Sequence, residues 1–224
     1  MAKKTIFITG ASTGIGAATA RAAAAAGWNV ALFARSADKL EALAGEIGEA
    51  ALALPGDVTD LAAQEAAVAK TVETFGGLDA AFANAGKGID TPGTVAGDPA
   101  EWRQLIDLNI MGLLYTARVS LPELEKTKGT LVLTGSAAGR RHIRGSIYGA
   151  TKWFVHGYAG NMADEMAAWG GRCAVIAPGM VDTPFFDDPK PDKLQPEDVA
   201  EAVIYAISAP PHVVIREVHM WPAN

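Results

Sequence analysis

A glycine-rich segment near the amino terminus constrains the fold of this chain more than any other feature. Residues 9–16 read TGASTGIG and lie between a short apolar run, 5–9, and an alanine-rich stretch, 17–26. The run is typical of a buried β-strand, and the stretch is typical of a helix. Glycines at such a junction allow a tight turn, and the free amides of the helix N-terminus then face a bound anion. The segment predicts a binding site for a dinucleotide pyrophosphate.

Similar apolar runs recur along the chain, with helical patterns between them. The predicted strands cover residues 5–9, 29–34, 51–54, 79–83, 130–134, 172–177 and 213–220. Strands that alternate with helices and are apolar on both faces are typical of a parallel sheet covered by helices on each side. Because the crossovers are right-handed, we predict an α/β Rossmann fold. It would be a doubly wound, mostly parallel, seven-stranded sheet forming a single domain over residues 1–224.

Composition argues against several classes of function. The 19 basic and 25 acidic side chains give a net charge of −6, which disfavours binding to nucleic acid or to an anionic membrane. No apolar run reaches the roughly 20 residues of a membrane span. The amino terminus lacks the apolar core of a signal peptide, so we expect a cytoplasmic protein. The lone cysteine, Cys173, and the 4 histidines show no metal-ligand spacing, so no metal is predicted.

Glycines and polar residues follow the predicted strands at one edge of the sheet, the carboxyl edge, where such sheets bind ligands. In strand order they are the glycine segment, Arg35, Asp57, Asn84 to Gly86, Ser136, and Pro178 with Gly179. We expect these loops to converge on one cleft. The proline-rich segment 180–196 is expected to be a substrate loop over this cleft. An ordinary surface connection is the alternative.

Tyr148 and Lys152 place a phenol and an ammonium group one helical turn apart. The cation is expected to stabilise the phenolate and so to lower the pKa of Tyr148, which would then exchange a proton near neutral pH. A packed tyrosine and a helix-surface lysine are the alternative reading of each residue by itself.

These motifs together resemble the short-chain dehydrogenase/reductase family. The shared features are TGxxxGxG at residues 9–16, Asn-Ala-Gly at 84–86, Tyr148 with Lys152, and a Pro-Gly turn followed by Thr183. The resemblance implies a catalytic group of Asn109, Ser136, Tyr148 and Lys152. In it, Tyr148 exchanges a proton with the substrate oxygen, to which Ser136 donates a hydrogen bond. Lys152 holds the nicotinamide ribose, and Asn109 holds a water that links Lys152 to solvent.

The resemblance also implies which residues bind the cofactor. They are Gly10, Ser12, Thr13, Gly14, Ile15, Gly16, Arg35, Ser36, Asp57, Val58, Asn84, Ala85, Gly86, Tyr148, Lys152, Pro178, Gly179, Val181 and Thr183. After the second strand, the acid that would bind the ribose 2′-hydroxyl of NAD is replaced by Ala34, and Arg35 follows. A guanidinium group suits a 2′-phosphate. We therefore predict NADP, with use of NAD as the alternative if Arg35 stacks on the adenine.

The sequence also yields predictions for the substrate and for subunit assembly. Ser136, Tyr148 and Arg144 are expected to contact a small alcohol or carbonyl compound, with a solvated loop as the alternative for the basic cluster 140–144. The interval between Ser136 and Tyr148 is slightly shorter than is common in the family. The region 195–218 resembles the serine and 3-hydroxy acid dehydrogenase subgroup.

A homodimer or homotetramer is expected. The predicted subunit contacts are the apolar helix residues Trp153, Phe154, Val155, Tyr158 and Met162 and the helix around 111–119, with burial inside the monomer as the alternative.

The motifs are compatible with two functions. The first is an NADP-dependent oxidoreductase that interconverts an alcohol and a carbonyl by hydride transfer, with Tyr148 as acid and base. The second is a catalytically silent NADP(H)-binding sensor or regulator with the same fold. The pair Tyr148 and Lys152 favours the enzyme, because a sensor does not need a proton-transfer pair. A methyltransferase on a related sheet would not need this pair either.

Overall fold

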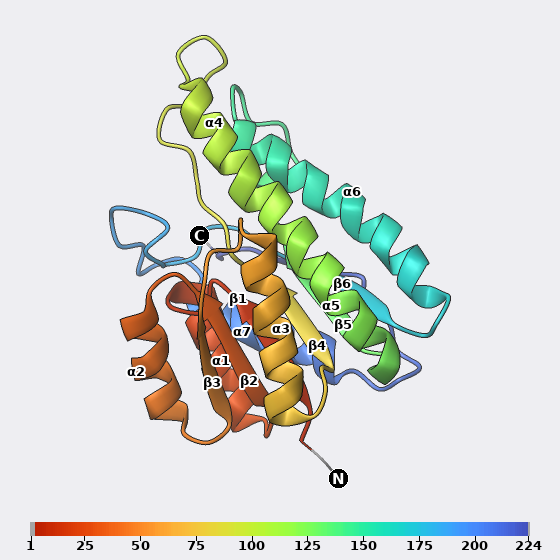
Figure 1. The fold of residues 1–224 in the computed structure, drawn as a ribbon. Coiled ribbons are helices and arrows are strands. Elements are labelled where there is room, and N and C mark those ends of the chain that lie inside the picture. Colours follow the sequence, from red (N-terminus) through yellow and green to blue (C-terminus); the bar gives the residue numbers. More distant parts are fainter. Residues whose placement is uncertain (1–2, 224) are drawn as a thin grey trace.

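The computed structural model of the protein describes residues 3–223. Seven strands form one sheet in the order β3-β2-β1-β4-β5-β6-β7, and every neighbouring pair is parallel (Figure 1). The predicted doubly wound α/β sheet is confirmed, and it is parallel throughout. The strands are β1 (Thr5–Thr9), β2 (Asn29–Ala34), β3 (Ala51–Pro55), β4 (Ala80–Ala83), β5 (Thr130–Thr134), β6 (Arg172–Pro178) and β7 (Glu217–Met220).

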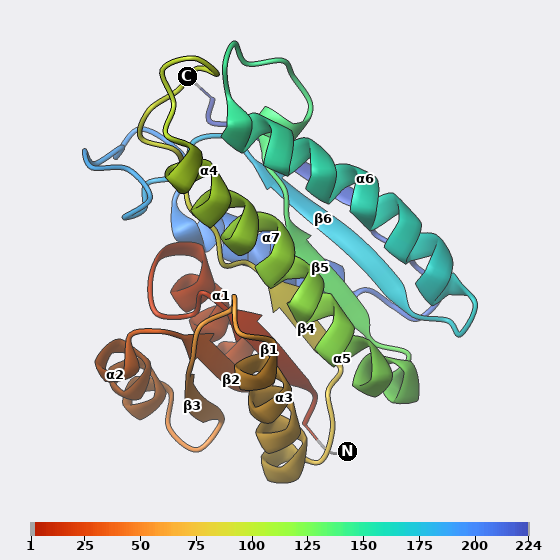
Figure 2. The ribbon, with the colours of Figure 1, turned by 45° about the horizontal axis from the view of Figure 1, so that its top comes forward.

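Helices cover both faces of the sheet (Figure 2). One face carries α1 (Gly14–Ala25), α2 (Ala37–Ile47) and α7 (Pro196–Ser208). The other carries α3 (Leu61–Phe75), α5 (Leu113–Thr127) and α6 (Ile147–Ala167). The π-helical segment η1 (Asp107–Gly112) joins α4 (Pro99–Ile106) to α5, and a 3-10 turn, η2 (Ala137–Gly139), follows β5. No helix within residues 3–223 is both long and apolar enough to span a membrane.

Strand β1 shows how the alternation of side chains builds two apolar cores. Ile6 and Ile8 are buried in the core beneath α1 and α7. Phe7 points to the opposite face, where its ring lies 5.6 Å from that of Phe33. Because successive strand residues face opposite sides, a central strand covered on both faces needs apolar side chains facing each way along its middle. This is why β1 has a continuous apolar run at its centre.

The carboxyl-terminal strand is shorter than predicted. It begins at Glu217 rather than at Val213. The Arg172 guanidinium group donates hydrogen bonds to the carbonyl oxygens of Ala209, Pro210 and Val213, at 2.8, 3.3 and 3.3 Å. Because these carbonyl groups are bonded to Arg172, the chain near residue 210 forms a loop around that side chain. Parallel pairing with β6 begins only at Glu217. The apolar pattern of 213–220 does not reveal this competition.

Close packing at Gly16 joins helix α1 to the end of β1. A Cβ atom at residue 16 would lie 2.2 Å from the Gly10 carbonyl oxygen and 2.9 Å from Nδ2 of Asn84. The Gly10 carbonyl is backbone, and Asn84 Nδ2 is held by hydrogen bonds to the Thr9 and Gly10 carbonyl oxygens, so neither can easily move aside. The absence of a side chain here sets how closely the helix approaches the sheet.

Gly16→Ala is expected to lower the free energy of unfolding by about 2–3 kcal/mol, because the added methyl group overpacks a backbone contact. Gly45→Ala in α2 is the matched control. No atom lies within 4 Å of a Cβ atom at residue 45, so helix propensity should stabilise that variant by about 0.5–1 kcal/mol. Urea denaturation followed by circular dichroism measures both changes. Equal effects of the two substitutions would contradict the packing argument.

Candidate active site

The glycine turn leads into the first turn of α1, whose amide groups are available to an anion. The N-cap residue, Thr13, makes no side-chain hydrogen bond to them. Gly10 and Gly14 have φ angles of +66° and +52°, a region that favours glycine. Ser12 and Ile15 are half-buried in the same turn. Because first-turn amides carry partial positive charge, this turn fits a dinucleotide pyrophosphate.

Asn84 ties the carboxyl ends of three strands together. Its Nδ2 donates to the carbonyl oxygens of Thr9, at 3.0 Å, and Gly10, at 3.4 Å. The Thr134 hydroxyl donates to Asn84 Oδ1 at 3.3 Å. The Asn84 and Ala85 amides both donate to Thr9 Oγ1, at 3.1 and 3.3 Å. This junction fixes the floor of the site, where β1, β4 and β5 end side by side.

Asn109 lies in η1 and is buried. Its Oδ1 accepts from the Lys87 amide at 2.9 Å, and its Nδ2 donates to the Lys87 carbonyl at 3.0 Å. Nδ2 also donates to the Thr151 hydroxyl on α6 at 3.2 Å. A Cβ atom at Gly86 would lie 3.3 Å from Asn109 Oδ1. Asn109 therefore holds the segment after β4 against α6.

Ser136 and Tyr148 come together beyond the end of β5. Ser136 is the N-cap of η2, and its Oγ accepts from the Ala138 amide at 3.1 Å. The Ser136 side chain lies close enough to the Tyr148 phenol to favour its ionised form. Because the Ala138 amide already fills an acceptor position of Oγ, the hydroxyl proton of Ser136 is left to donate. The tyrosine and the serine thus face the same point in the site.

Lys152 lies one helical turn after Tyr148 and is buried. Its Nζ donates to the Thr134 carbonyl at 2.8 Å and is 5.8 Å from the centroid of the Tyr148 ring. Burial lowers the pKa of Lys152 to about 8, because a charged group loses solvation there.

The predicted fall in the pKa of Tyr148 is wrong. Burial raises the pKa of Tyr148 above its ordinary value, and the Ser136 side chain opposes the rise only in part. Desolvation penalises both the phenolate and the ammonium form, and Thr134 engages the ammonium group. The phenol is therefore protonated near neutral pH.

The end of β2 presents an unengaged cation. Arg35 is exposed, and among residues 3–223 no hydrogen bond or ion pair holds its guanidinium group. Ser36 caps α2 without a side-chain hydrogen bond. Asp57 accepts from the Thr59 amide and hydroxyl, both at 2.9 Å, and Val58 is buried beside Gly112. Arg35 and Ser36 are thus open to a ligand phosphate, whereas Asp57 already serves its own turn.

The segment 180–196 returns across the site from the end of β6. Pro178 ends that strand, and the Gly179 amide donates to the Met220 carbonyl at 2.7 Å. Val181 is buried and forms a parallel bridge with Leu194. A Cβ atom at Gly14 would lie 3.2 Å from Thr183 Cγ2, so Thr183 reaches the glycine turn.

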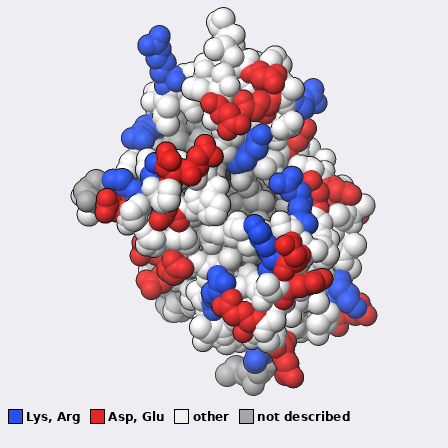
Figure 3. Space-filling view, turned by 90° about the vertical axis from the view of Figure 1, so that its left-hand side faces the viewer, with Lys and Arg blue, Asp and Glu red and all other residues white. Residues whose placement is uncertain are grey.

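Phe185 is a site residue that the sequence analysis missed. Its ring centroid lies 5.6 Å from that of Tyr148, and a Cβ atom at Gly88 would be 3.1 Å from its ring. Its proline-rich surroundings indicate only a loop, so the sequence carries no signal for this contact. Figure 3 shows that the surface is hollowed on this side of the molecule, with Lys and Arg side chains at the border of the hollow.

The basic cluster 140–144 is dispersed. Arg140 pairs with Glu217, Arg141 lies over the Trp221 ring, and His142 stacks on Trp153. Arg144 is exposed, and no contact among residues 3–223 ties it to Ser136 or Tyr148.

Part of the predicted subunit surface lies inside the monomer. Val155 and Met162 are buried in the core beneath α6, and Phe154 and Tyr158 pack against that core. Trp153 is 41% exposed. For Val155 and Met162, the alternative of burial within the monomer is therefore correct.

Comparison with known proteins places these features in one family. The family model for short chain dehydrogenase matches residues 4–193. An uncharacterized oxidoreductase of Staphylococcus aureus is 37% identical over 225 residues, covering 98% of this chain and 97% of the relative.

Solved structures agree. An alcohol dehydrogenase from the archaeon Thermococcus sibiricus, complexed with 5-hydroxy-NADP, has a TM-score of 0.91 at 32% identity and covers 99% of this chain and 97% of that one. Serine dehydrogenase from Escherichia coli has a TM-score of 0.88 at 30% identity, with 97% of each chain covered. The chain therefore belongs to the short-chain dehydrogenase family, and it is an enzyme that acts on CH–OH groups.

Proposed function

We propose that this enzyme is an NADP-dependent oxidoreductase that interconverts a small alcohol and the corresponding carbonyl compound, with Tyr148 as the acid and base. The observation that carries the proposal is the cluster beyond the end of β5: Tyr148 and the buried amine of Lys152, 5.8 Å from its ring centroid, lie beside the turn that begins at Ser136. Three such groups at the carboxyl edge of a dinucleotide fold suit proton exchange with a substrate oxygen.

The cofactor assignment rests on the two ends of the proposed dinucleotide site. The uncapped first turn of α1 fits the pyrophosphate. Arg35 is an exposed planar cation at the end of β2, with no acid at residue 34 to repel a 2′-phosphate. The Thermococcus relative is complexed with an NADP derivative, which supports the same choice.

The protein's own residues would act on the substrate oxygen from one side. When bound, the nicotinamide supplies or accepts the hydride. Tyr148 holds a proton at its phenol oxygen, and burial keeps that proton in place near neutral pH. The protonated phenol is the form that carbonyl reduction requires. Ser136 donates a hydrogen bond to the same oxygen and stabilises the charge that develops there.

Lys152 and Asn109 would support this chemistry without touching the substrate. With a pKa of about 8, Lys152 is mostly an ammonium group near neutral pH, which can hold ribose hydroxyls. Asn109 fixes the segment after β4 through both Lys87 backbone groups. A water held by Asn109 that links Lys152 to solvent is part of the proposal.

The proposed substrate is a hydroxy acid or a small carbonyl compound. Phe185 against Tyr148 narrows the space above the phenol, so a compact substrate fits best. Arg144 at the rim is the proposed partner of a substrate carboxylate. The likeness to serine dehydrogenase supports this class. We further propose that the exposed Trp153 belongs to a contact between subunits of a homodimer or homotetramer.

Tyr148→Phe is expected to lower the rate of NADPH-dependent carbonyl reduction at least about 100-fold, because only the proton donor is lost while the ring keeps its contact with Phe185. NADPH oxidation at the nicotinamide absorbance, against a panel of ketones and keto acids, gives the rate. Fluorescence titration gives the NADPH affinity, which should change far less than the rate. Tyr158→Phe, on the same helix, is the control and should keep its activity. Tight NADPH binding without turnover by the unmodified enzyme would favour the sensor function instead.

Arg35→Ala is expected to raise the KM for NADPH by about 10- to 100-fold, the effect of losing a charge-assisted hydrogen bond to phosphate. The KM for NADH should stay within about twofold, since NADH has no 2′-phosphate. Arg21→Ala removes the same charge from a residue that pairs with Glu46, and it should change neither constant. Equal changes for both cofactors in Arg35→Ala would contradict the NADP assignment and support use of NAD.

A further inference from the structure

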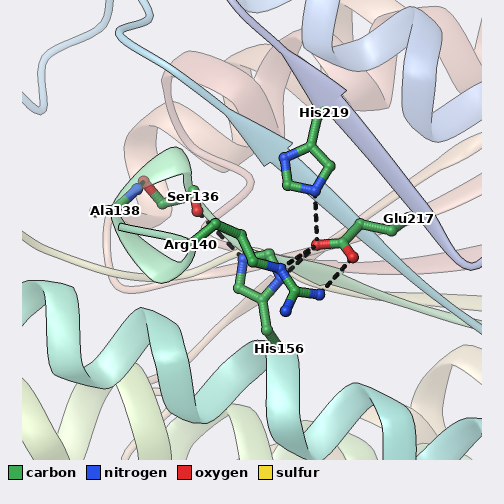
Figure 4. A network of polar contacts seen from close by, with 6 residues as sticks. All are labelled: Ser136, Ala138, Arg140, His156, Glu217 and His219. Carbon is green, nitrogen blue, oxygen red and sulfur yellow. Dashed lines mark hydrogen bonds and ion pairs between the residues drawn. The ribbon is translucent and has the colours of Figure 1, made fainter. Parts of the chain in front are cut away.

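His156 is a buried ionisable residue that the proposed reaction does not use. It lies on α6 four residues after Lys152, and its side chain is 1% exposed. Its Nε2 is 3.2 Å from the Ser136 carbonyl oxygen, and its Nδ1 is 2.5 Å from Oε1 of Glu217 on β7. The contact with Glu217 is an ion pair when the imidazole is protonated. Figure 4 shows the imidazole between the turn that carries Ser136 and the Glu217 carboxylate.

The turn that carries Ser136 wraps tightly around the imidazole ring. A Cβ atom at Gly135 would lie 2.9 Å from Nε2 of His156, and one at Gly139 would lie 2.5 Å from its Cδ2. The backbone on both sides of Ser136 therefore approaches the ring more closely than any residue with a side chain allows. The position of the ring sets the path of residues 135–139.

Glu217 holds the far end of the same turn. Arg140, the C-cap of η2, contacts the carboxylate with Nη2 at 2.6 Å and Nε at 3.2 Å. His219 approaches Oε1 at 3.0 Å from the more exposed side and stacks on His156. One carboxylate thus fixes His156 at the start of η2 and Arg140 at its end (Figure 4).

Burial and neighbouring charged groups together set the pKa values of Glu217 and His156. Burial acts to raise the pKa of Glu217, but Arg140, His156 and His219 together hold that pKa below its ordinary value. Burial lowers the pKa of His156, against the opposing influence of the Ser136 carbonyl and of Glu217. A carbonyl oxygen can only accept a hydrogen bond, so Nε2 is the donor in the contact that supports the Ser136 turn.

We propose that His156, held by Glu217 and Arg140, is a positioning residue that fixes the backbone carbonyl of Ser136 and thereby aims the Ser136 hydroxyl at the substrate oxygen. The inference rests on the proposed function, since it assigns His156 to the serine of that reaction. The His156 side chain is 1% exposed and faces Ser136 and Glu217, so the proposed role gives it no contact with substrate or cofactor. Its effect should therefore appear in kcat and in the order of the turn rather than in cofactor binding.

The test compares His156→Leu with His156→Gln, whose side-chain amide can still donate to the Ser136 carbonyl. His156→Leu is expected to lower kcat by about 10- to 100-fold, the scale of a small misplacement of a catalytic group, with the NADPH dissociation constant within about twofold of its original value. His156→Gln should recover most of kcat. His212→Gln, which changes an exposed histidine outside this cluster, is the control and should resemble the unmodified enzyme.

Hydrogen–deuterium exchange of a peptide spanning 135–140 supplies a readout that does not need turnover. The Gly139 amide donates to the Ser136 carbonyl at 2.9 Å, and its exchange should quicken about tenfold in His156→Leu. If that variant fails to fold, Arg140→Gln at the exposed end of the cluster should quicken the same peptide. Unchanged exchange in the folded variants, or a glutamine variant as impaired as the leucine one, would overturn the inference. Loss of the proposed function alone would instead appear as an unmodified enzyme that reduces no carbonyl while the exchange difference persists.

Discussion

The side-chain amide of Asn84 makes the junction on which the site depends. Parallel strands end at one edge with carbonyl and amide groups that no further strand pairs, and these groups need partners when they are buried. Asn84 donates to two such carbonyl oxygens after β1, those of Thr9 and Gly10, and it accepts from the Thr134 side-chain hydroxyl at the end of β5. The glycine turn, the segment after β4 and the Ser136 turn all start from this junction. Its geometry therefore determines the proposed cofactor and substrate positions alike.

Helix α6 supplies the second half of the site from one stripe of residues. Tyr148, Lys152 and His156 follow at intervals of four, so all three lie on the same face of the helix. Each meets a group just beyond or at the end of β5: Tyr148 meets the Ser136 side chain, Lys152 the Thr134 carbonyl and His156 the Ser136 carbonyl. Three residues on one face of α6 thus contact three groups at or just beyond the end of β5.

Apolar runs and turn glycines were sufficient to predict the sheet and the edge that carries the site. Both depend on local patterns: a strand buried on two faces needs apolar side chains facing each way along its middle, and a helix packed on a strand end requires glycine at residue 16. Contacts between distant segments were not predictable in this way. The engagement of Arg172 with carbonyls near residue 210 shortened β7, and Phe185 reached Tyr148 from a loop without periodicity.

The pKa shifts were the property that the sequence predicted least well. The spacing of Tyr148 and Lys152 gives their proximity, but the sign of the shift in the phenol pKa depends on burial, which the spacing does not contain. His156 had a usable signal, because its interval from Lys152 repeats that of Lys152 from Tyr148. Its importance still depends on Glu217, 61 residues further on, and only the fold brings that carboxylate to it.

A crystal structure of the complex with NADP tests the central claim most directly, namely that one cleft at the carboxyl edge unites the glycine turn, Arg35 and the Tyr148 group. We predict the pyrophosphate at the first turn of α1, the 2′-phosphate at Arg35 and the nicotinamide ring beside Tyr148. A dinucleotide bound elsewhere, or bound with its nicotinamide ring remote from Tyr148 and Lys152, would contradict the account.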